Sequence, residues 1–264
     1  MIGAVIGDIV GSRFEWDNIK TKEFTLFTND CKFTDDSVMS LAVAKAILEC
    51  NGDYTTLGDL SVKYMQEIGR LYPGCGYGGM FKRWIFADTP APYSSFGNGA
   101  AMRISACGFA AKSLDAAKFL SRKVTAVSHN HPEGLKGAEA TAVCIFLARI
   151  GKTIPEIREY VIREYYPLNF TLDAIRDNYQ FNETCQETVP QAITSFLESS
   201  SFEDAIRNAV SIGGDSDTLA AIAGGIAEAY YGVPVKIRSQ ALAFLDERLR
   251  DIIFNFENTF PRMR

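Results

Sequence analysis

Three stretches rich in alanine and glycine constrain the fold of this chain more than any other feature. They cover residues 99–111, 137–148 and 219–229, and each carries small side chains at helical spacing. Small residues at that spacing allow the backbones of packed helices to approach closely. The alternation of polar and apolar residues that marks β-strands is nearly absent. The sequence therefore predicts an all-α fold, a compact bundle of roughly ten helices.

Apolar periodicity and capping residues locate several of these helices. Residues 38–48 are apolar on nearly every side, which is typical of a buried helix, whereas residues 56–71 have apolar side chains at every third or fourth position, as in an amphipathic helix. Thr153 and Glu156 form a capping-box pattern, and Ser201 precedes another helical apolar pattern. Both positions are predicted helix starts.

The composition is that of an ordinary globular protein. With 264 residues, of which 47% are hydrophobic and 22% charged, we expect a single domain spanning residues 1–264. The net charge of -5 provides no basic face, which argues against non-specific nucleic-acid binding, although a local nucleotide site remains compatible. No apolar run reaches the roughly twenty residues that span a bilayer, and the first residues lack the basic region of a signal peptide. The six cysteines include no CxxC pair and fit a reducing compartment, so we expect a cytoplasmic protein. We also expect a monomer.

Two acidic clusters stand directly ahead of apolar helical segments. One is Thr34-Asp35-Asp36, and the other is Asp215-Ser216-Asp217-Thr218. N-capping explains one side-chain oxygen at each helix start, and for either cluster alone it remains the alternative interpretation. Each cluster, however, provides two carboxylates and a threonine, and carboxylates packed near a core are costly without a counter-charge. Ligands that are all oxygen atoms favour Mg²⁺ or Mn²⁺ over zinc, and their number suggests two ions.

Five short motifs, taken in chain order, resemble the ADP-ribosylglycohydrolase family. They are GDIVGSRFE at residues 7–15, TDD at 34–36, GNGAAMR at 97–103, SHNHP at 128–132 and GDSDT at 214–218. The resemblance extends to about residue 231 and implies an orthogonal all-α bundle. It also implies a pair of Mg²⁺ or Mn²⁺ ions at the mouth of an ADP-ribose cleft.

The same resemblance implies roles for individual residues. The implied metal ligands are Thr34, Asp35, Asp36, Asp215, Asp217 and Thr218, and Glu15 is implied to be an acidic residue beside the metals. The implied substrate contacts are Ser95, Phe96, Gly97, Asn98, Gly99 and His129. Phe96 matches a ring that stacks on adenine, and His129 matches a histidine near the distal ribose. Glycines allow close approach to a diphosphate, and a helix starting near residue 100 would favour the anion, although a plain glycine turn is the alternative. Arg103 is expected to contact either phosphate or an internal carboxylate, and residues 165–188 carry no recognisable motif.

The function implied is hydrolysis of the N- or O-glycosidic bond between ADP-ribose and an ADP-ribosylated protein or small-molecule acceptor. Asp35 or Glu15 would accept a proton from the attacking water. Two alternatives remain: a phosphohydrolase with two metal ions, and a non-catalytic ADP-ribose-binding or structural relative. The acceptor itself, whether arginine, serine, a base or a small ester, stays open.

Overall fold

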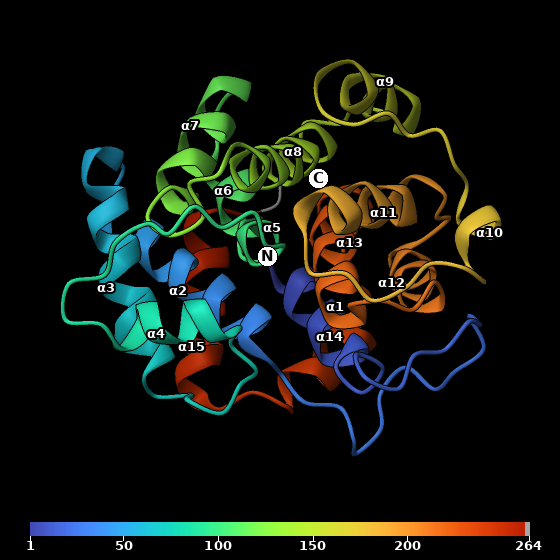
Figure 1. Cartoon of the computed structure of the whole chain (residues 1–264), viewed down its shortest axis with the longest axis horizontal. Coiled ribbons are helices and arrows are strands. Elements are labelled where there is room, and N and C mark those ends of the chain that lie inside the picture. Colours follow the sequence, from blue (N-terminus) through green and yellow to red (C-terminus); the bar gives the residue numbers. More distant parts are fainter. Residues whose placement is uncertain (262–264) are drawn as a thin grey trace.

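The computed structural model describes residues 1–261, and within them the chain folds into fifteen α-helices and one short 3-10 helix, with no β-strand (Figure 1). The all-α prediction is therefore confirmed. Three helices have six residues or fewer, too short for apolar periodicity to reveal, which partly explains why the number exceeds the prediction. The helices are α1 (Ile2–Gly11), α2 (Asp35–Glu49), α3 (Leu57–Gly69), α4 (Gly79–Phe86), α5 (Gly99–Met102), α6 (Ser105–Ala110), α7 (Leu114–Thr125), α8 (Pro132–Arg149), α9 (Ile154–Glu164), α10 (Leu172–Ile175), α11 (Cys185–Leu197), α12 (Phe202–Ser211), α13 (Ser216–Tyr231), α14 (Val235–Leu242) and α15 (Glu247–Thr259).

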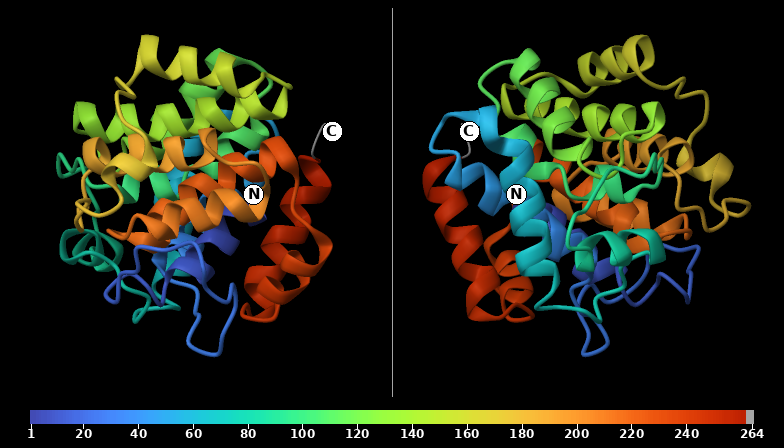
Figure 2. Two further views of the ribbon diagram at one scale, coloured as in Figure 1. Left: turned by 90° about the vertical axis from the view of Figure 1, so that its right-hand side faces the viewer. Right: turned by 60° about the vertical axis from the view of Figure 1, so that its left-hand side comes forward.

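Helix α13 lies at the centre of the bundle. All of its residues except the last two are buried, and it packs against α1, α8, α11 and α12. A second group is formed by α2 with α3 and α15, and α15 lies along one side of the molecule in Figure 2. None of the helices in residues 1–261 is long and apolar enough to cross a membrane.

Helices α1 and α13 are in direct backbone contact along a row of three glycines. Gly3, Gly7 and Gly11 recur every four residues and therefore share one face of α1. A Cβ atom on Gly7 would lie 1.9 Å from the carbonyl oxygen of Ala220, and one on Gly11 would lie 2.4 Å from that of Ser216. No side chain fits between the two helices at these points. The contact brings the C-terminal half of α1 against the first turn of α13.

The predicted helix starts are confirmed. Thr153 and Glu156 form a complete capping box at the start of α9, and Ser201 accepts a hydrogen bond from the Asp204 N–H at the start of α12. The helix predicted at residues 38–48 is α2, which begins earlier, at Asp35. The amphipathic helix predicted at residues 56–71 is α3.

The stretch at residues 99–111 forms two short helices in place of one long helix. Helix α5 ends at Met102, so Arg103 follows this helix and is not part of it. Arg103 Nε donates to the Gly99 carbonyl, the acceptor that its own N–H would use if the helix continued. Because α5 has only four residues, its dipole would contribute little to the anion binding that was expected at this point.

Candidate metal centre

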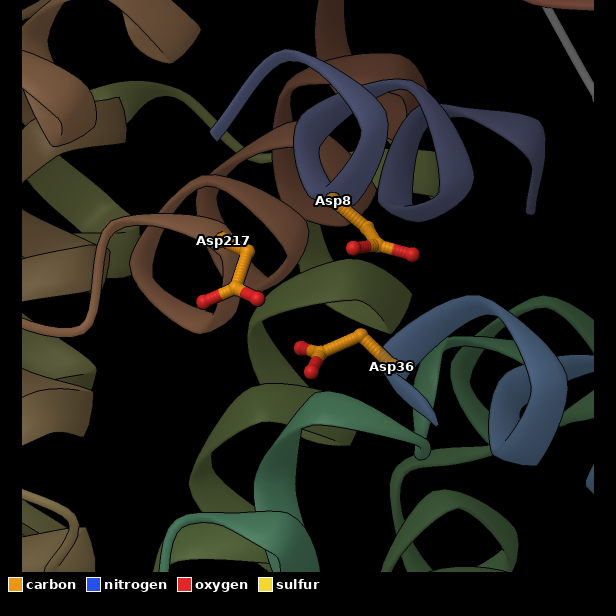
Figure 3. A group of neighbouring side chains, drawn as sticks. All are labelled: Asp8, Asp36 and Asp217. Carbon is orange, nitrogen blue, oxygen red and sulfur yellow. The ribbon is translucent and has the colours of Figure 1, made fainter. Parts of the chain in front are cut away.

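Three helices bring three buried carboxylates to one point in the core. Asp8 comes from α1, Asp36 from the first turn of α2 and Asp217 from the first turn of α13, and their side chains point toward one another (Figure 3). One carboxylate oxygen from each lies within 4.8 Å of the others. The two predicted acidic clusters, 180 residues apart in sequence, therefore meet in the fold, together with an aspartate that was not predicted.

A second acidic group shares one member with the first. Glu15, Asp215 and Asp217 also place one oxygen each within 4.8 Å of one another. Asp215 and Asp217 are buried, whereas Glu15 is half-buried in the loop that follows α1. Two groups that share Asp217 have the arrangement expected of neighbouring ion sites with a common ligand.

The cluster fits a divalent cation by charge and by donor type. Among the described residues, none of these five carboxylates takes part in a salt bridge. Asp36 Oδ1 is buried and has no hydrogen-bond partner. A buried anionic oxygen without a partner is costly, and a hard cation coordinated by oxygen atoms would compensate it. The residues present therefore suit a Mg²⁺- or Mn²⁺-type site.

Burial and mutual repulsion raise the pKa values throughout the cluster. Burial raises the pKa of Asp36 well above its usual range, and the Asp217 carboxylate adds to the effect. The pKa of Asp217 is raised well above its usual range in the same way, by burial and then by Asp215. Burial, then Asp217, raises the pKa of Glu15 to about 7, and burial raises the pKa of Asp215 to about 6. Without a cation, this site therefore favours protonated carboxyl groups.

Asp8 has a different environment from its neighbours because its oxygens are occupied. It accepts hydrogen bonds from the Thr34 N–H (2.9 Å), the Thr34 hydroxyl (2.7 Å), the Ser37 N–H (3.0 Å) and the Ser37 hydroxyl. Burial raises the pKa of Asp8, and these hydrogen bonds lower it. Asp8 therefore shapes the start of α2. The four-residue spacing of glycines around it was the sequence signal that would have predicted its packing position.

The remaining predicted ligands occupy three different positions. Asp35 lines the cleft described below, and its N–H donates to the Cys75 carbonyl over 2.8 Å. The Thr218 hydroxyl donates to Asp36 Oδ2 over 3.3 Å. The Thr34 hydroxyl is engaged with Asp8 and does not line the cleft, so its role as a ligand stays a prediction.

A cleft of about 580 Å³ opens at the acidic cluster. Its lining includes all six residues predicted to contact substrate, together with every predicted metal ligand except Thr34. Those substrate-contact residues are Ser95, Phe96, Gly97, Asn98, Gly99 and His129. The fold thus brings the two predicted groups of residues into one cavity, whose volume is in the range of small-molecule sites.

Asn98 links the glycine-rich loop directly to the acidic cluster. Its Nδ2 donates to Asp215 Oδ2 over 2.7 Å and to the Thr188 hydroxyl over 3.2 Å. The ring of Phe96, two residues earlier, is 43% exposed and stands edge-on against His131, with centroids 5.2 Å apart. A flat apolar surface is therefore available at the cleft for a stacked base.

The segment of residues 179–188, which carries no motif, supports both halves of the site. The Asn98 N–H donates to the Glu183 carbonyl over 2.7 Å, and the Cys185 N–H donates to the Phe96 carbonyl over 2.9 Å. These bonds flank an isolated antiparallel bridge between residues 97 and 184. The Tyr179 ring packs on Gly214, where an added Cβ would lie 2.4 Å from Cε1 and where φ is +78°. Both facts require glycine at position 214.

Neither His129 nor Arg103 forms an ion pair within the described part of the chain. Burial, then the Arg103 charge, lowers the pKa of His129 well below its usual range, so its imidazole is neutral at physiological pH. His129 Nδ1 lies 2.8 Å from the Ser128 hydroxyl. The Arg103 guanidinium lies 4.3 Å from the centre of the Phe81 ring and donates to the Gly99 carbonyl. One of the two expectations for Arg103, an ion pair with an internal carboxylate, is therefore not met among the described residues.

The loop that carries Glu15 is anchored by a lysine five residues after it, Lys20. Lys20 Nζ donates to the Tyr179 carbonyl over 2.7 Å and to the Ile212 carbonyl over 2.6 Å. Lys20 therefore ties this loop to the segment that covers Gly214 and to the end of α12. Three segments distant in sequence are held together at this side of the acidic cluster.

The fold and the site define a class of helical protein in which carboxylates without salt-bridge partners line a cleft large enough for a nucleotide. The model of the ADP-ribosylglycohydrolase family matches residues 1–258, and the chain belongs to that family. It is 24% identical to ADP-ribosylhydrolase ARH3 of Xenopus tropicalis, over 93% of this chain and 91% of the relative. It is 26% identical to ADP-ribosylarginine hydrolase Tri1 of Pseudomonas putida (strain GB-1), over 88% of this chain and 70% of the relative.

A solved structure supports the same fold. The protein called ADP-ribosylglycohydrolase-related protein complex superimposes with a TM-score of 0.67 at 20% sequence identity. The match covers 97% of this chain and 95% of the other. The predicted family and fold class are thereby confirmed, since the family model and the structural match agree over nearly the whole chain.

Proposed function

We propose that this protein hydrolyses the glycosidic bond between ADP-ribose and a modified acceptor, and releases ADP-ribose. The observation that carries the proposal is that the unpaired carboxylates and the glycine-rich loop of residues 95–99 line the same cleft. Carboxylates with two ions suit the reacting end of such a substrate, and glycine N–H groups with an aromatic ring suit its diphosphate and adenine. Membership of the family supports this reading.

Two Mg²⁺ or Mn²⁺ ions are the cofactors that we propose for the acidic cluster. The residues that would hold them are Thr34, Asp35, Asp36, Asp215, Asp217 and Thr218, with Glu15 beside them. Such ions supply Lewis acidity, which favours the ionisation of a nearby water molecule.

The chain's own groups then position the substrate and move one proton. Asn98 orients the Asp215 carboxylate, and Glu15 and Asp35 line the cleft where they can accept the proton that the attacking water loses. The water oxygen forms a bond to the anomeric carbon, and the bond from that carbon to the acceptor nitrogen or oxygen breaks. The acceptor atom gains one proton, so the net reaction adds one water molecule across the bond.

The names of the relatives leave the acceptor open. The Pseudomonas putida relative is named for ADP-ribosylarginine, whereas the name ADP-ribosylhydrolase ARH3 specifies no acceptor. We propose an ADP-ribosylated protein or small molecule as the substrate.

Product analysis tests the proposed reaction. The purified protein would be incubated with a panel of ADP-ribosylated acceptors, with Mg²⁺, with Mn²⁺ or with a chelator, and the products identified by mass spectrometry. We expect intact ADP-ribose to appear only when a divalent ion is present. Release of AMP or inorganic phosphate would instead identify a phosphohydrolase, and tight ADP-ribose binding without turnover would identify a non-catalytic binding protein.

A further inference from the structure

An exposed tryptophan forms part of the rim of the cleft, directly beside the acidic cluster. Trp16 follows Glu15 in sequence and lines the same cleft. Its indole stacks on Phe181, with ring centroids 4.9 Å apart and planes inclined by 24°. Trp16 is nevertheless 77% exposed. An indole that is supported on one face and remains this exposed presents its other face to solvent.

The proposed ADP-ribose contacts leave Trp16 without a role. Phe96 serves the adenine and is in contact with His131, whereas Trp16 is adjacent to Glu15 and therefore to the reacting end of the cleft. Burying the indole would contribute more to stability than leaving it at a rim. Tryptophan is enriched at binding interfaces, because its ring combines a large apolar surface with a polar N–H group.

Two carboxylates, those of Glu15 and Glu183, line the cleft together with Trp16. Glu183 lies two residues from Phe181, is exposed and lines the cleft. Its negative charge contributes to the raised pKa of Glu15. The two cations among the lining residues, Arg83 and Arg103, come from α4 and from the end of α5. The positive charge of Lys32 lowers the pKa of Glu15, but Lys32 does not line the cleft.

A planar cation is the group that this surface would recognise best. The face of an indole attracts cations through its quadrupole, and a guanidinium group stacks on it more readily than a compact ammonium does. A nearby carboxylate adds a hydrogen-bond acceptor for the guanidinium N–H groups. A serine hydroxyl or an ester has neither the charge nor the plane to use these contacts.

We propose that Trp16 and Glu183 form the acceptor subsite and select ADP-ribosylated arginine, whose guanidinium group stacks on the free face of the indole. This inference rests on the proposed function, because it assigns the leaving-group side of the same cleft. The bond that breaks joins the anomeric carbon to a guanidinium nitrogen. The nitrogen takes up the proton, and the carbon keeps the water oxygen.

The test compares two substrates and four variants in the presence of Mg²⁺. The substrates are peptides of one sequence that carry ADP-ribose either on arginine or on serine. The variants are Trp16→Ala, Trp16→Phe, Glu183→Gln and, as a control, Phe119→Ala, which removes a ring that is 47% exposed on α7 and outside the cleft. Melting temperatures verify that each variant is folded, and calorimetry measures the affinity for ADP-ribose.

We expect the wild-type protein to cleave the arginine-linked peptide in preference to the serine-linked one. Trp16→Ala should lower kcat/KM for the arginine peptide about tenfold, in the range of a partly desolvated cation–π contact. Trp16→Phe should retain most of the activity, Glu183→Gln should show a loss of several-fold, and Phe119→Ala should behave as the wild type does. The affinity of Trp16→Ala for ADP-ribose should stay unchanged, because ADP-ribose lacks the acceptor.

The other outcomes separate the two proposals. If the wild-type protein released ADP-ribose only from serine, the acceptor subsite would be wrong and the hydrolase function would stand. Equal arginine activity in Trp16→Ala and wild type would equally overturn the subsite. If no acceptor were cleaved under any metal condition, the proposed function itself would fail, and this inference with it.

Discussion

The side-chain amide of Asn18 and the backbone of Gly214 donate hydrogen bonds to each other. The Gly214 N–H donates to Asn18 Oδ1 over 2.7 Å, and Asn18 Nδ2 donates to the Gly214 carbonyl over 2.9 Å. The same Nδ2 lies 2.6 Å from the Phe14 carbonyl oxygen. One asparagine therefore connects the loop of Glu15 to the turn that carries Asp215. The relative position of these two carboxylates depends on this contact.

We predict that Asn18→Ala weakens Mg²⁺ binding by about tenfold, the size typical of losing a group that orients metal ligands. The reason is that both the Glu15 loop and the Gly214 turn lose a shared partner. Isothermal titration calorimetry with the metal alone measures the effect. Asn29→Ala, at another exposed position in the loop between α1 and α2, is the matched control. Unchanged metal affinity in Asn18→Ala would show that the ligands are positioned without this residue.

Asp36→Asn should abolish most activity and at the same time stabilise the metal-free protein. Removing a group that only hydrogen-bonds a metal ligand lowers activity roughly 10–100-fold, and removing the ligand itself should lower activity further. Without metal, however, burial and the charge of Asp217 make ionisation of Asp36 costly, and Asp36 Oδ1 has no partner, so a permanently neutral amide removes the cost of ionising or protonating this group. Initial rates and the melting temperature in chelator provide the two readouts, and Asp35→Asn and Asp217→Asn should lose activity similarly. Wild-type turnover in all three variants would contradict the metal assignment.

The affinity for Mg²⁺ should rise between pH 5 and pH 8, with release of protons. In the folded protein the pKa of Asp215 is raised to about 6 and that of Glu15 to about 7, from ordinary values of 3.8 and 4.5. Because the folded state holds these protons more tightly, the groups stabilise the metal-free protein at low pH, and this contribution disappears as pH rises through about 6 to 7. A cation must displace the same protons, so it binds better at higher pH. Calorimetry in two buffers of different ionisation enthalpy counts the protons released, and pH-independent affinity would contradict the expectation.

Glu15→Gln should reduce turnover far more than it reduces the affinity for ADP-ribose. A residue that accepts a proton from water acts chiefly in the transition state, so its removal lowers kcat and leaves ground-state binding nearly intact. Initial rates set beside calorimetric titration with ADP-ribose in Mg²⁺ measure both quantities. A parallel collapse of binding and turnover would indicate that Glu15 serves as a metal ligand or a structural group.

ADP-ribose should raise the melting temperature, and more strongly with Mg²⁺ than in chelator. At 100 times its dissociation constant a ligand that binds only the native state adds about 2.7 kcal/mol. For a protein of this size the shift should be several degrees, roughly 5 to 10 °C. AMP should stabilise less and show little dependence on metal, because it lacks the distal ribose. The family reading would be overturned by a thermal shift with inorganic phosphate alone and none with ADP-ribose under any metal condition.

The sequence predicted the helical class and the chemistry of the site better than its spatial organisation. Small residues and caps have local signatures, so α2, α3, α9 and α12 were recognisable from periodicity and capping. The excess of carboxylates at two helix starts likewise indicated a cation site. These features depend on residues near one another in the chain.

Features that depend on distant segments were missed. Asp8 belongs to the cluster because α1 packs on α13, more than 200 residues away in the sequence, and residues 179–188 support the glycine-rich loop through backbone groups of no particular sequence. Arg103 illustrates a further limit. Its side chain competes for a helix carbonyl and ends α5, an outcome that no local propensity predicts.

The glycine contact between α1 and α13 has a kinetic consequence for the metal centre. Because no side chains separate the two helices, they cannot shift relative to each other without opening a void, and Asp8 and Asp217 remain in place in the metal-free protein. The backbone amides of this pair should exchange with deuterium only through global unfolding. We therefore expect metal uptake to require no movement of α1 relative to α13. Stopped-flow measurement of Mg²⁺ binding should then show no slow phase from a rearrangement of these two helices.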